Sequence, residues 1–243
     1  GTLDALRHDL APALAAGEVP FFEPGLDEVL RRAIDSGRLT FTTDWAQVGT
    51  FADAHFLCVG TPQKLGSQSA DLSYVDAAIA ELTPYLTRPT LVIGKSTVPV
   101  GTAQRLADYL AAYAPVGTEA RLAWNPEFLR EGFAVEDTVK PDRLVFGVDT
   151  DASTEVLFEI YEPVTAHGMP VIVTDRATAE LVKVAANSFL ATKISFINAM
   201  AEICEVVGGD VAVLSDAIGH DTRIGRRFLN SGVGFGGGCL PKD

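Results

Sequence analysis

The chain has 243 residues, 47% of them hydrophobic, so it can bury a core and form one large domain or two small ones. It carries 19 Lys and Arg against 32 Asp and Glu, which gives a net charge of −13 and a pI of about 4.7. Nucleic acids and anionic membrane surfaces bind clustered cations, so we expect neither as a partner. No apolar run approaches the ~20 residues of a membrane span, and we expect no secretory leader.

Strand-like runs alternate with helical patterns through residues 1–174. Apolar or β-branched runs predict strands over Leu39–Thr43, His55–Val59, Thr90–Gly94, Arg121–Trp124, Arg143–Val148 and Pro170–Thr174. Helical periodicity predicts helices over Leu26–Ser36, Ser73–Leu86, Thr102–Ala114 and Thr154–Glu162. Such alternation with short connections is typical of parallel strands covered by helices. We therefore expect an α/β fold with a partial Rossmann-like parallel sheet and helices on both faces.

Polar residues follow three of these predicted strands. They form the segments Gly60-Thr61-Pro62, Lys95-Ser96-Thr97 and Asn125-Pro126-Glu127. Ligands of open α/β sheets bind beyond the carboxyl ends of the strands, so we expect these three loops to share one functional edge.

Residues 176–207 predict one long helix, with Asp175 as its N-cap and Gly208-Gly209 as its stop. We expect this helix to lead from an α/β domain at residues 1–174 into an all-helical domain at residues 175–243. Six basic and six acidic residues balance within residues 181–243. A negatively charged small molecule would dock more readily there, although ordinary variation in surface charge explains the balance equally well.

The three cysteines differ in their surroundings. They are an odd number and widely spaced, so we expect a reducing cytoplasm and no disulfide framework. Cys58 and Cys204 lie in apolar stretches and are expected to be small buried residues. Cys239 instead follows five glycines within residues 232–239 and precedes Pro241 and Lys242. A thiol at a helix N-terminus beside a lysine ionises readily, so Cys239 is a candidate nucleophile. The four scattered histidines give no support to a metal site.

Two pairs of polar residues are spaced four apart. Lys183 and Asn187 lie within an apolar stretch of the long helix and would share one face. Considered by themselves, Lys183 and Asn187 are explained by snorkelling or capping. Together with Cys239, they could stabilise an oxyanion. Glu127 and Glu131 could meet on one helical face, either as a solvated acidic surface or as carboxylates that activate water.

Seven segments, in order along the chain, resemble the UDP-glucose/GDP-mannose dehydrogenase family. They are Pro20-Phe-Phe-Glu-Pro-Gly-Leu26, Val59-Gly-Thr-Pro62, Lys95-Ser-Thr-Val-Pro-Val100, Asn125-Pro-Glu-Phe-Leu-Arg-Glu-Gly132, Pro141-Asp-Arg-Leu-Val-Phe-Gly147, Glu180-Leu-Val-Lys-Val-Ala-Ala-Asn187 and Gly234-Phe-Gly-Gly-Gly-Cys-Leu-Pro-Lys-Asp243. Each segment alone is a modest signal, but seven in the family's order are highly specific. The family's opening Rossmann unit with its Gly-rich turn and its C-terminal UDP-binding domain are absent, so we expect a fragment of a larger enzyme. The fragment by itself is expected to be inactive.

The resemblance implies an NAD-dependent four-electron oxidation of UDP-glucose to UDP-glucuronate. Cys239 would capture the aldehyde as a thiohemiacetal, which is then oxidised to a thioester and hydrolysed. Lys183 and Asn187 would stabilise oxyanions, and Asp243 would assist proton transfer. Glu127 would activate the hydrolytic water, with Thr97 helping to position it.

The resemblance also implies binding residues and partners. NAD contacts are implied for Val59, Thr61, Thr97, Glu131 and Lys242. Substrate contacts are implied for Phe128, Leu129, Arg130, Glu131, Lys183, Asn187, Arg223, Asn230, Ser231, Gly232, Val233, Gly234, Phe235 and Gly236. Because Arg223 would reach a substrate in a neighbouring subunit, we expect a homodimer or a higher homo-oligomer.

Other functions remain open from the sequence. A related dehydrogenase acting on GDP-mannose or a UDP-N-acetylhexosamine is one alternative, although Pro141-Asp-Arg143 and Arg223–Leu229 favour UDP-glucose. A non-catalytic dimerisation scaffold with an inert Cys239 is another.

Overall fold

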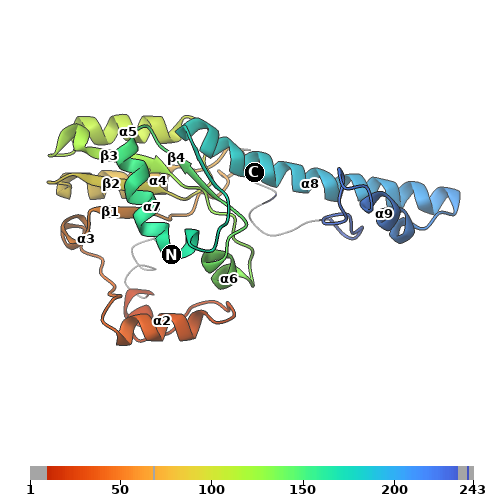
Figure 1. Ribbon diagram of the computed structural model, residues 1–243, viewed down its shortest axis with the longest axis horizontal. Helices are drawn as coiled ribbons and strands as arrows, with labels where there is room; N and C mark the ends of the chain where they lie inside the picture. The colour runs from red at the N-terminus through yellow and green to blue at the C-terminus, as the bar shows by residue number, and fades with distance from the viewer. Residues whose placement is uncertain (1–9, 68, 235–239, 241–243) are drawn as a thin grey trace. The chain divides into compact units, whose positions relative to one another are not determined.

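A computed structural model describes residues 10–67, 69–234 and 240 of the chain (Figure 1). Five candidate site residues lie outside the described residues: Phe235, Gly236, Cys239, Lys242 and Asp243. The chain divides into two compact units. The first unit comprises Gly1–Thr61 and Leu72–Glu180, and the second comprises Pro62–Asp71 and Leu181–Asp243.

The first unit contains a five-stranded sheet in the order β1-β2-β3-β4-β5. Its strands are β1 (Ala54–Leu57), β2 (Thr90–Gly94), β3 (Ala120–Trp124), β4 (Leu144–Gly147) and β5 (Val171–Thr174). Five of the six predicted strands are thereby confirmed. The prediction of a strand at Leu39–Thr43 is wrong, because this stretch has no regular structure. A strand is stabilised by ladder hydrogen bonds to a neighbour, and none of the described strands pairs with this stretch.

The sheet is mostly parallel, with one reversal of direction. Strands β1, β2 and β3 pair in parallel, and so do β4 and β5. β3 and β4 are antiparallel and meet at Trp124 and Gly147. The expectation of a wholly parallel sheet is therefore corrected at this junction. The residues between β3 and β4 form a connection without a full crossover helix, which a parallel pairing of neighbouring strands requires.

Helices cover both faces of this sheet. All five residues of β2 are buried, and successive strand residues point to opposite faces. One face packs against α7 (Asp151–Thr165), which crosses in front of the strands in Figure 1, through a cluster that contains Leu91, Phe146 and Leu157. α5 (Thr102–Tyr113) lies against β3, with α4 (Ser73–Leu82) beside it. The predicted α/β layers are confirmed.

The remaining helices of the first unit are short and lie between the strands or near the N-terminus. They are a helical segment at residues 10–15, α2 (Leu26–Asp35), α3 (Trp45–Phe51), α6 (Ala134–Val139) and the 3₁₀ turns η1 (Thr83–Tyr85) and η2 (Gly117–Glu119). We did not predict α3. Its start is capped by the Asp44 carboxylate, which accepts hydrogen bonds from the backbone N–H groups of Ala46 and Gln47.

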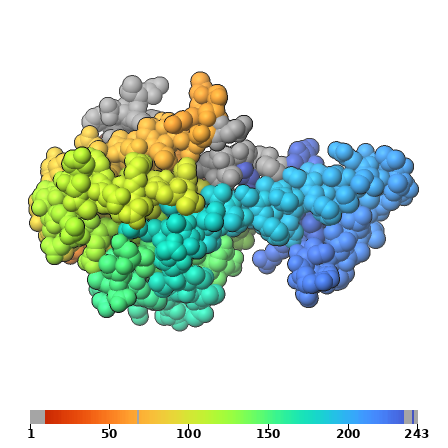
Figure 2. All heavy atoms as spheres, turned by 90° about the horizontal axis from the view of Figure 1, so that it is seen from above, coloured from red at the N-terminus to blue at the C-terminus, as the bar shows by residue number. Residues whose placement is uncertain are grey.

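The long helix α8 (Arg176–Val207) has the predicted bounds. Asp175 caps its start by accepting a 2.8 Å hydrogen bond from the N–H of Thr178. Within the second unit, α9 (Val211–Gly219) lies along the C-terminal part of α8 in both Figure 1 and Figure 2. None of the helices among the described residues has the length and apolar content needed to cross a membrane.

Two of the cysteines lie within the described residues and differ in exposure. Cys204 is buried on α8, as expected. Cys58 is exposed, so the expectation of a buried residue is wrong. It directly follows Leu57, the last residue of β1, and within the part of the chain that the structure describes β1 pairs with β2 alone.

Candidate active site

The loops after β1 and β2 each donate one side-chain hydrogen bond to the backbone of the other. Thr61, which is buried, donates its hydroxyl to the carbonyl oxygen of Thr97 at 2.7 Å. In return, Ser96 donates its hydroxyl to the carbonyl oxygen of Val59 at 2.5 Å. The structure thus brings together Val59, Thr61 and Thr97, three residues that we predicted to contact a cofactor. The loops lie at the carboxyl edge of parallel strands, where dinucleotides bind in sheets of this kind.

A second set of polar contacts links Lys95, Asn125 and Tyr161. The Lys95 ammonium donates to Asn125 Oδ1 at 2.9 Å, to the Asn125 carbonyl at 3.3 Å and to the Tyr161 hydroxyl at 3.2 Å. Tyr161 donates its hydroxyl to the same Oδ1 at 2.5 Å, and Asn125 Nδ2 donates to the carbonyl of Val145 at 3.0 Å. Asn125 is fully buried. These contacts join the loop after β2, the loop after β3, β4 and α7.

Burial dominates the acid–base properties of this cluster. It lowers the pKa of Lys95, while the nearby Cys58 and Glu127, when ionised, oppose that shift. Burial also raises the pKa of Tyr161 to about 12, with a smaller contribution from Cys58, so Tyr161 keeps its proton and can donate it to Asn125.

The segment after Asn125 is irregular rather than helical. Glu127 accepts a 2.6 Å hydrogen bond from the N–H of Leu129 through its own side chain. Residues 125–130 contain no helix, so the expectation that Glu127 and Glu131 share a helical face is wrong. Pro126 has no N–H, and a side chain that binds the backbone two residues later favours a turn over a helix.

Further contacts hold the rest of this segment. Arg130 forms a bidentate ion pair with Asp137, whose two oxygens lie 2.9 and 2.6 Å from the guanidinium nitrogens. Glu23, far away in sequence, accepts hydrogen bonds from the N–H groups of Gly132 at 2.9 Å and Ala134 at 2.8 Å. Of the predicted contact residues, Leu129, Arg130 and Glu131 are exposed, whereas Phe128 is half-buried with the Arg143 guanidinium 3.9 Å from its ring centre.

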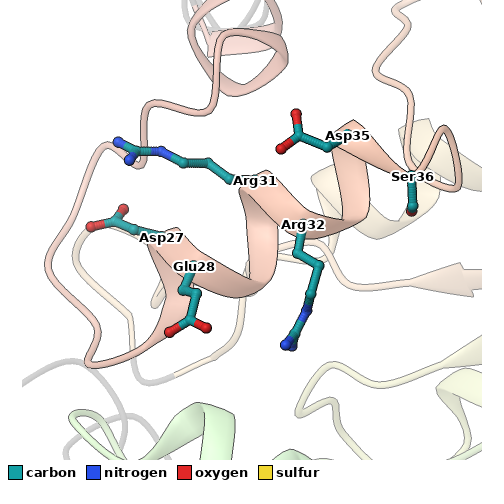
Figure 3. A pocket seen from close by; sticks show the side chains of 6 residues that line it. All are labelled: Asp27, Glu28, Arg31, Arg32, Asp35 and Ser36. Atoms are coloured by element: carbon teal, nitrogen blue, oxygen red, sulfur yellow. The ribbon is translucent and has the colours of Figure 1, made fainter.

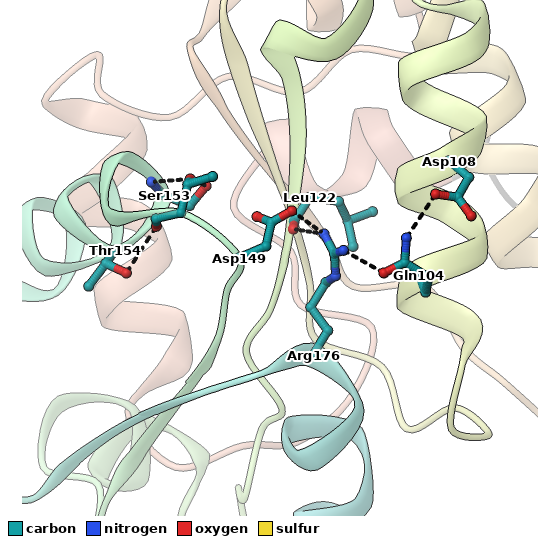
Figure 4. A network of polar contacts seen from close by, with 8 residues as sticks. Gln104, Asp108, Leu122, Asp149, Ser153, Thr154 and Arg176 are labelled. Carbon is teal, nitrogen blue, oxygen red and sulfur yellow. Dashed lines mark hydrogen bonds and ion pairs between the residues drawn. The ribbon is translucent and has the colours of Figure 1, made fainter.

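The start of α8 is anchored to the sheet and to α5. The Arg176 guanidinium contacts the Asp149 carboxylate at 3.0 Å, the Leu122 carbonyl at 3.2 Å and Gln104 Oε1 at 2.6 Å (Figure 4). One turn later, the buried Glu180 carboxylate accepts hydrogen bonds from the N–H groups of Gly101 at 2.7 Å and Ala103 at 2.6 Å. The carboxylate therefore binds N–H groups at the start of α5, which directly follows the loop that contains Thr97.

In the second unit, Lys183 and Asn187 lie one turn apart on α8. Lys183 is buried, with 7% of its surface exposed, and Asn187 is half-buried. Residues four apart on a helix lie on the same face, as predicted. Farther along α8, Asn198 Oδ1 accepts a 2.9 Å hydrogen bond from the N–H of Gly232. This contact ties the predicted substrate loop to the helix.

The predicted substrate residues beyond α9 are exposed. Asn230 accepts a 2.8 Å hydrogen bond from Arg226, whose guanidinium also contacts Asp216. Ser231, Gly232, Val233 and Gly234 are exposed. Arg223 is paired with Asp221 at 2.6 Å, and 87% of its side chain is exposed to solvent.

Some residues that shape these sites were not predicted. They are Glu23, Lys95, Tyr161, Glu180, Asn198 and Arg226. Lys95 was noted only as part of a motif, and its partner Tyr161 lies 66 positions away in the sequence. Glu23 and Glu180 likewise lay within the family segments, whereas the signal for Asn198 was a polar side chain within an apolar stretch.

A shallow hollow on α2 is not a candidate site. It is lined by Asp27, Glu28, Arg31, Arg32, Asp35 and Ser36, and Figure 3 shows these side chains spread around the helix rather than converging on one point. Binding sites instead place a few polar groups toward a common centre. Among the residues that the structure describes, no group of three or more His, Cys, Asp or Glu could hold a metal ion.

Comparisons with known proteins match most of the chain. The model for the NAD binding domain of the UDP-glucose/GDP-mannose dehydrogenase family matches residues 8–165, and the model for the central domain matches residues 177–243. The UDP-glucose 6-dehydrogenase of Rhizobium meliloti (strain 1021) is 46% identical over 233 residues, 95% of this chain and 53% of that protein.

Two solved structures give the same result. A UDP-glucose dehydrogenase from the hyperthermophilic archaeon Pyrobaculum islandicum has a TM-score of 0.91 and 42% identity, over 97% of this chain and 54% of its own. A ternary complex of GDP-mannose dehydrogenase from Pseudomonas aeruginosa has a TM-score of 0.81 and 31% identity, over 96% of this chain and 54% of its own. The chain therefore spans about half the length of the relatives that it matches.

Proposed function

Because the chain belongs to the UDP-glucose/GDP-mannose dehydrogenase family, we propose that the full-length protein containing it oxidises UDP-glucose to UDP-glucuronate with NAD. The observation that carries this proposal is the 46% identity to a UDP-glucose 6-dehydrogenase over nearly the whole chain. Identity to the GDP-mannose dehydrogenase structure is lower, at 31%, which favours UDP-glucose over GDP-mannose.

Residues 1–174 serve as the NAD-binding domain in this proposal, supported by the match of the NAD binding domain model to residues 8–165. When bound, NAD would supply the hydride acceptor for the two oxidation steps. The cross-linked loops that contain Val59, Thr61 and Thr97 fit this role, because they lie at the carboxyl edge of parallel strands. Glu131 and Lys242 complete the proposed NAD contacts.

Residues 175–243 form the central helical domain and carry the nucleophile. The Cys239 thiolate adds to the aldehyde carbon of the oxidised sugar, and loss of a hydride from this thiohemiacetal leaves a thioester. Lys183 and Asn187 stabilise the negative charge that develops on the sugar oxygen, since a buried cation and an amide donor share one face of α8. Asp243 assists the proton transfers.

Hydrolysis of the thioester completes the reaction. Glu127 accepts a proton from water, the water oxygen adds to the acyl carbon, and the bond from that carbon to sulfur breaks. Thr97 helps to position this water. The products are the carboxylate of UDP-glucuronate and the free Cys239.

The substrate is contacted by two segments in this proposal. Residues 128–131 are proposed substrate contacts, residues 230–236 are proposed to line the sugar, and Lys183 and Asn187 are proposed to act at the reacting carbon. Arg226 supports the second segment, because it holds the Asn230 side chain. Arg223 reaches the substrate of a neighbouring subunit.

A second copy of the protein is the proposed partner. Phe189, Phe196 and Ile203 are spaced seven residues apart on α8 and are 66%, 48% and 52% exposed. A seven-residue repeat places apolar side chains along one stripe of a helix, which suits packing against another helix. The exposed stripe therefore supports a homodimer or a higher homo-oligomer.

The cytoplasm is the proposed location. An odd number of cysteines, one of them required as a free thiolate, suits a reducing compartment.

The function is tested with a panel of nucleotide sugars and the full-length protein. We expect two NADH per UDP-glucose, with little turnover of GDP-mannose or UDP-N-acetylhexosamines. Cys239→Ala should abolish formation of the uronic acid, and Cys239→Ser should trap a covalent ester. Normal production of both NADH equivalents by Cys239→Ala would refute the mechanism.

A further inference from the structure

The surroundings of the Lys95 side chain match an ammonium group. Its nitrogen has three oxygen acceptors within 3.3 Å: two on Asn125 and one on Tyr161. A protonated lysine has three N–H donors, so each acceptor receives one. The nitrogen also lies 5.9 Å from the ring centre of Phe56, within the range of cation–π attraction.

Asn125 is the point at which these contacts converge. Its Oδ1 accepts from both Lys95 and Tyr161, and its Nδ2 donates to the carbonyl of Val145. The residue is fully buried, and its backbone N–H donates to the carbonyl of Gly94 at 2.8 Å. Both the backbone and the side chain of Asn125 are therefore fixed, and Glu127 follows two residues later across Pro126, whose φ is restricted.

We propose that Lys95 is a positioning residue for Glu127: its ammonium holds Asn125 and thereby fixes the carboxylate that removes a proton from the hydrolytic water. This inference rests on the function proposed above. Lys95 acts through Asn125 and affects the hydrolysis step, whereas both hydride transfers proceed without it.

Electrostatics supports the same arrangement. The groups that influence Lys95 from the surrounding elements are Cys58 after β1, Glu127 after β3 and Tyr161 on α7. Tyr161 keeps its proton and burial raises the pKa of the Cys58 thiol, so Glu127 is the group among these three that attracts the ammonium. Removal of the lysine charge would leave the polar atoms of buried Asn125 short of a donor.

The test uses the full-length protein and Lys95→Met, which preserves side-chain length and removes the charge. Misplacement of a catalytic group by about 1 Å costs about 100-fold, so we expect kcat to fall by about that factor. Because hydrolysis follows the hydride transfers, KM should fall with kcat and kcat/KM should stay unchanged. A pre-steady-state burst of two NADH per active site should be visible in this variant. Mass spectrometry of the quenched enzyme should then detect the thioester adduct, which should also accumulate in Glu127→Gln.

Two further variants complete the design. Tyr161→Phe removes only the hydroxyl that contacts Lys95 and Asn125, so it should accumulate the same adduct to a smaller extent, even where Lys95→Met fails to fold. Lys140→Met changes an exposed lysine in the same way and should behave as the unmodified protein.

The outcomes separate this inference from the proposed function. If Lys95→Met slowed hydride transfer and hydrolysis equally and no adduct accumulated, the positioning role would be overturned. The proposed function of the protein would still stand. Hydrolysis at the normal rate in a folded Lys95→Met protein would also overturn the positioning role alone. Failure of the unmodified protein to form two NADH per UDP-glucose would overturn the proposed function itself, and the role of Lys95 with it.

Discussion

Replacement of Gly94 by alanine tests the packing that fixes the end of β3. Gly94 pairs with Trp124 across the β2–β3 ladder, and Trp124 is fully buried. A Cβ added at Gly94 would lie 2.1, 2.3 and 2.5 Å from three atoms of the Trp124 ring. A Cβ atom essentially never lies within 3.0 Å of a non-bonded heavy atom, so the ring or the strand must shift.

The magnitude follows from the cost of overpacking a core. Such substitutions typically cost about 1–3 kcal/mol, and we expect the upper end of this range because the ring is completely enclosed. A loss of about 3 kcal/mol corresponds to a decrease of roughly 6–12 °C in the thermal midpoint of a domain of this size. The displaced ring would also move Asn125, the next residue in the chain.

Thermal unfolding of the full-length protein, followed by tryptophan fluorescence, measures the effect. Gly60→Ala is the matched control, because a Cβ at Gly60 would meet no atom within 4 Å. We expect the control to change the free energy of unfolding by less than about 0.5 kcal/mol. A midpoint for Gly94→Ala within one or two degrees of the unmodified protein, or about the same as the control, would refute the reasoning.

Three further perturbations probe the helix anchor, the apolar stripe and an ion pair. Glu180→Gln offers one acceptor oxygen to the N–H groups of Gly101 and Ala103, so the protein should lose about 1–3 kcal/mol, measured as a lower thermal midpoint. Phe196→Glu places a charge on the exposed stripe of α8 and should shift the full-length protein toward monomer in light scattering; an unchanged mass would contradict the dimer. The hydrogen bond from Arg130 lowers the pKa of Asp137, so this pair should stabilise the protein above pH ~4 and lose its effect as the pH falls through that lowered pKa. The difference in thermal midpoint between the unmodified protein and Asp137→Asn should therefore shrink on acidification, and a constant difference would contradict the pairing.

Patterns within a short stretch of sequence predicted the first and last residues of some elements correctly. β2 and α8 have the predicted bounds, because a short apolar run and a capped helical period are both encoded within a few neighbouring positions. The error at Leu39–Thr43 has the opposite cause: whether an apolar run becomes a strand depends on a partner elsewhere in the chain. The direction of β4 likewise depends on pairing that no local pattern specifies.

The candidate site likewise has features that the sequence predicted and features that it did not. The loops after β1, β2 and β3 could be assigned to one edge from the alternation of elements, and the Thr61–Thr97 contact agrees with that assignment. Asn125 was recognised as part of a motif, but its partners come from three other segments of the chain. A buried hydrogen-bond cluster is a property of the folded core, so its members could not be inferred one at a time.

The reversal between β3 and β4 affects how this protein can diverge. Asn125 at the end of β3 bonds Val145 of β4, so the connection between the two strands leaves and re-enters the sheet at the same rim. Both of its anchor points are thus set by the framework, and its interior can lengthen or change sequence without disturbing strand order. Sequence changes within this connection can therefore alter one rim of the first unit while the strand order beneath it stays constant.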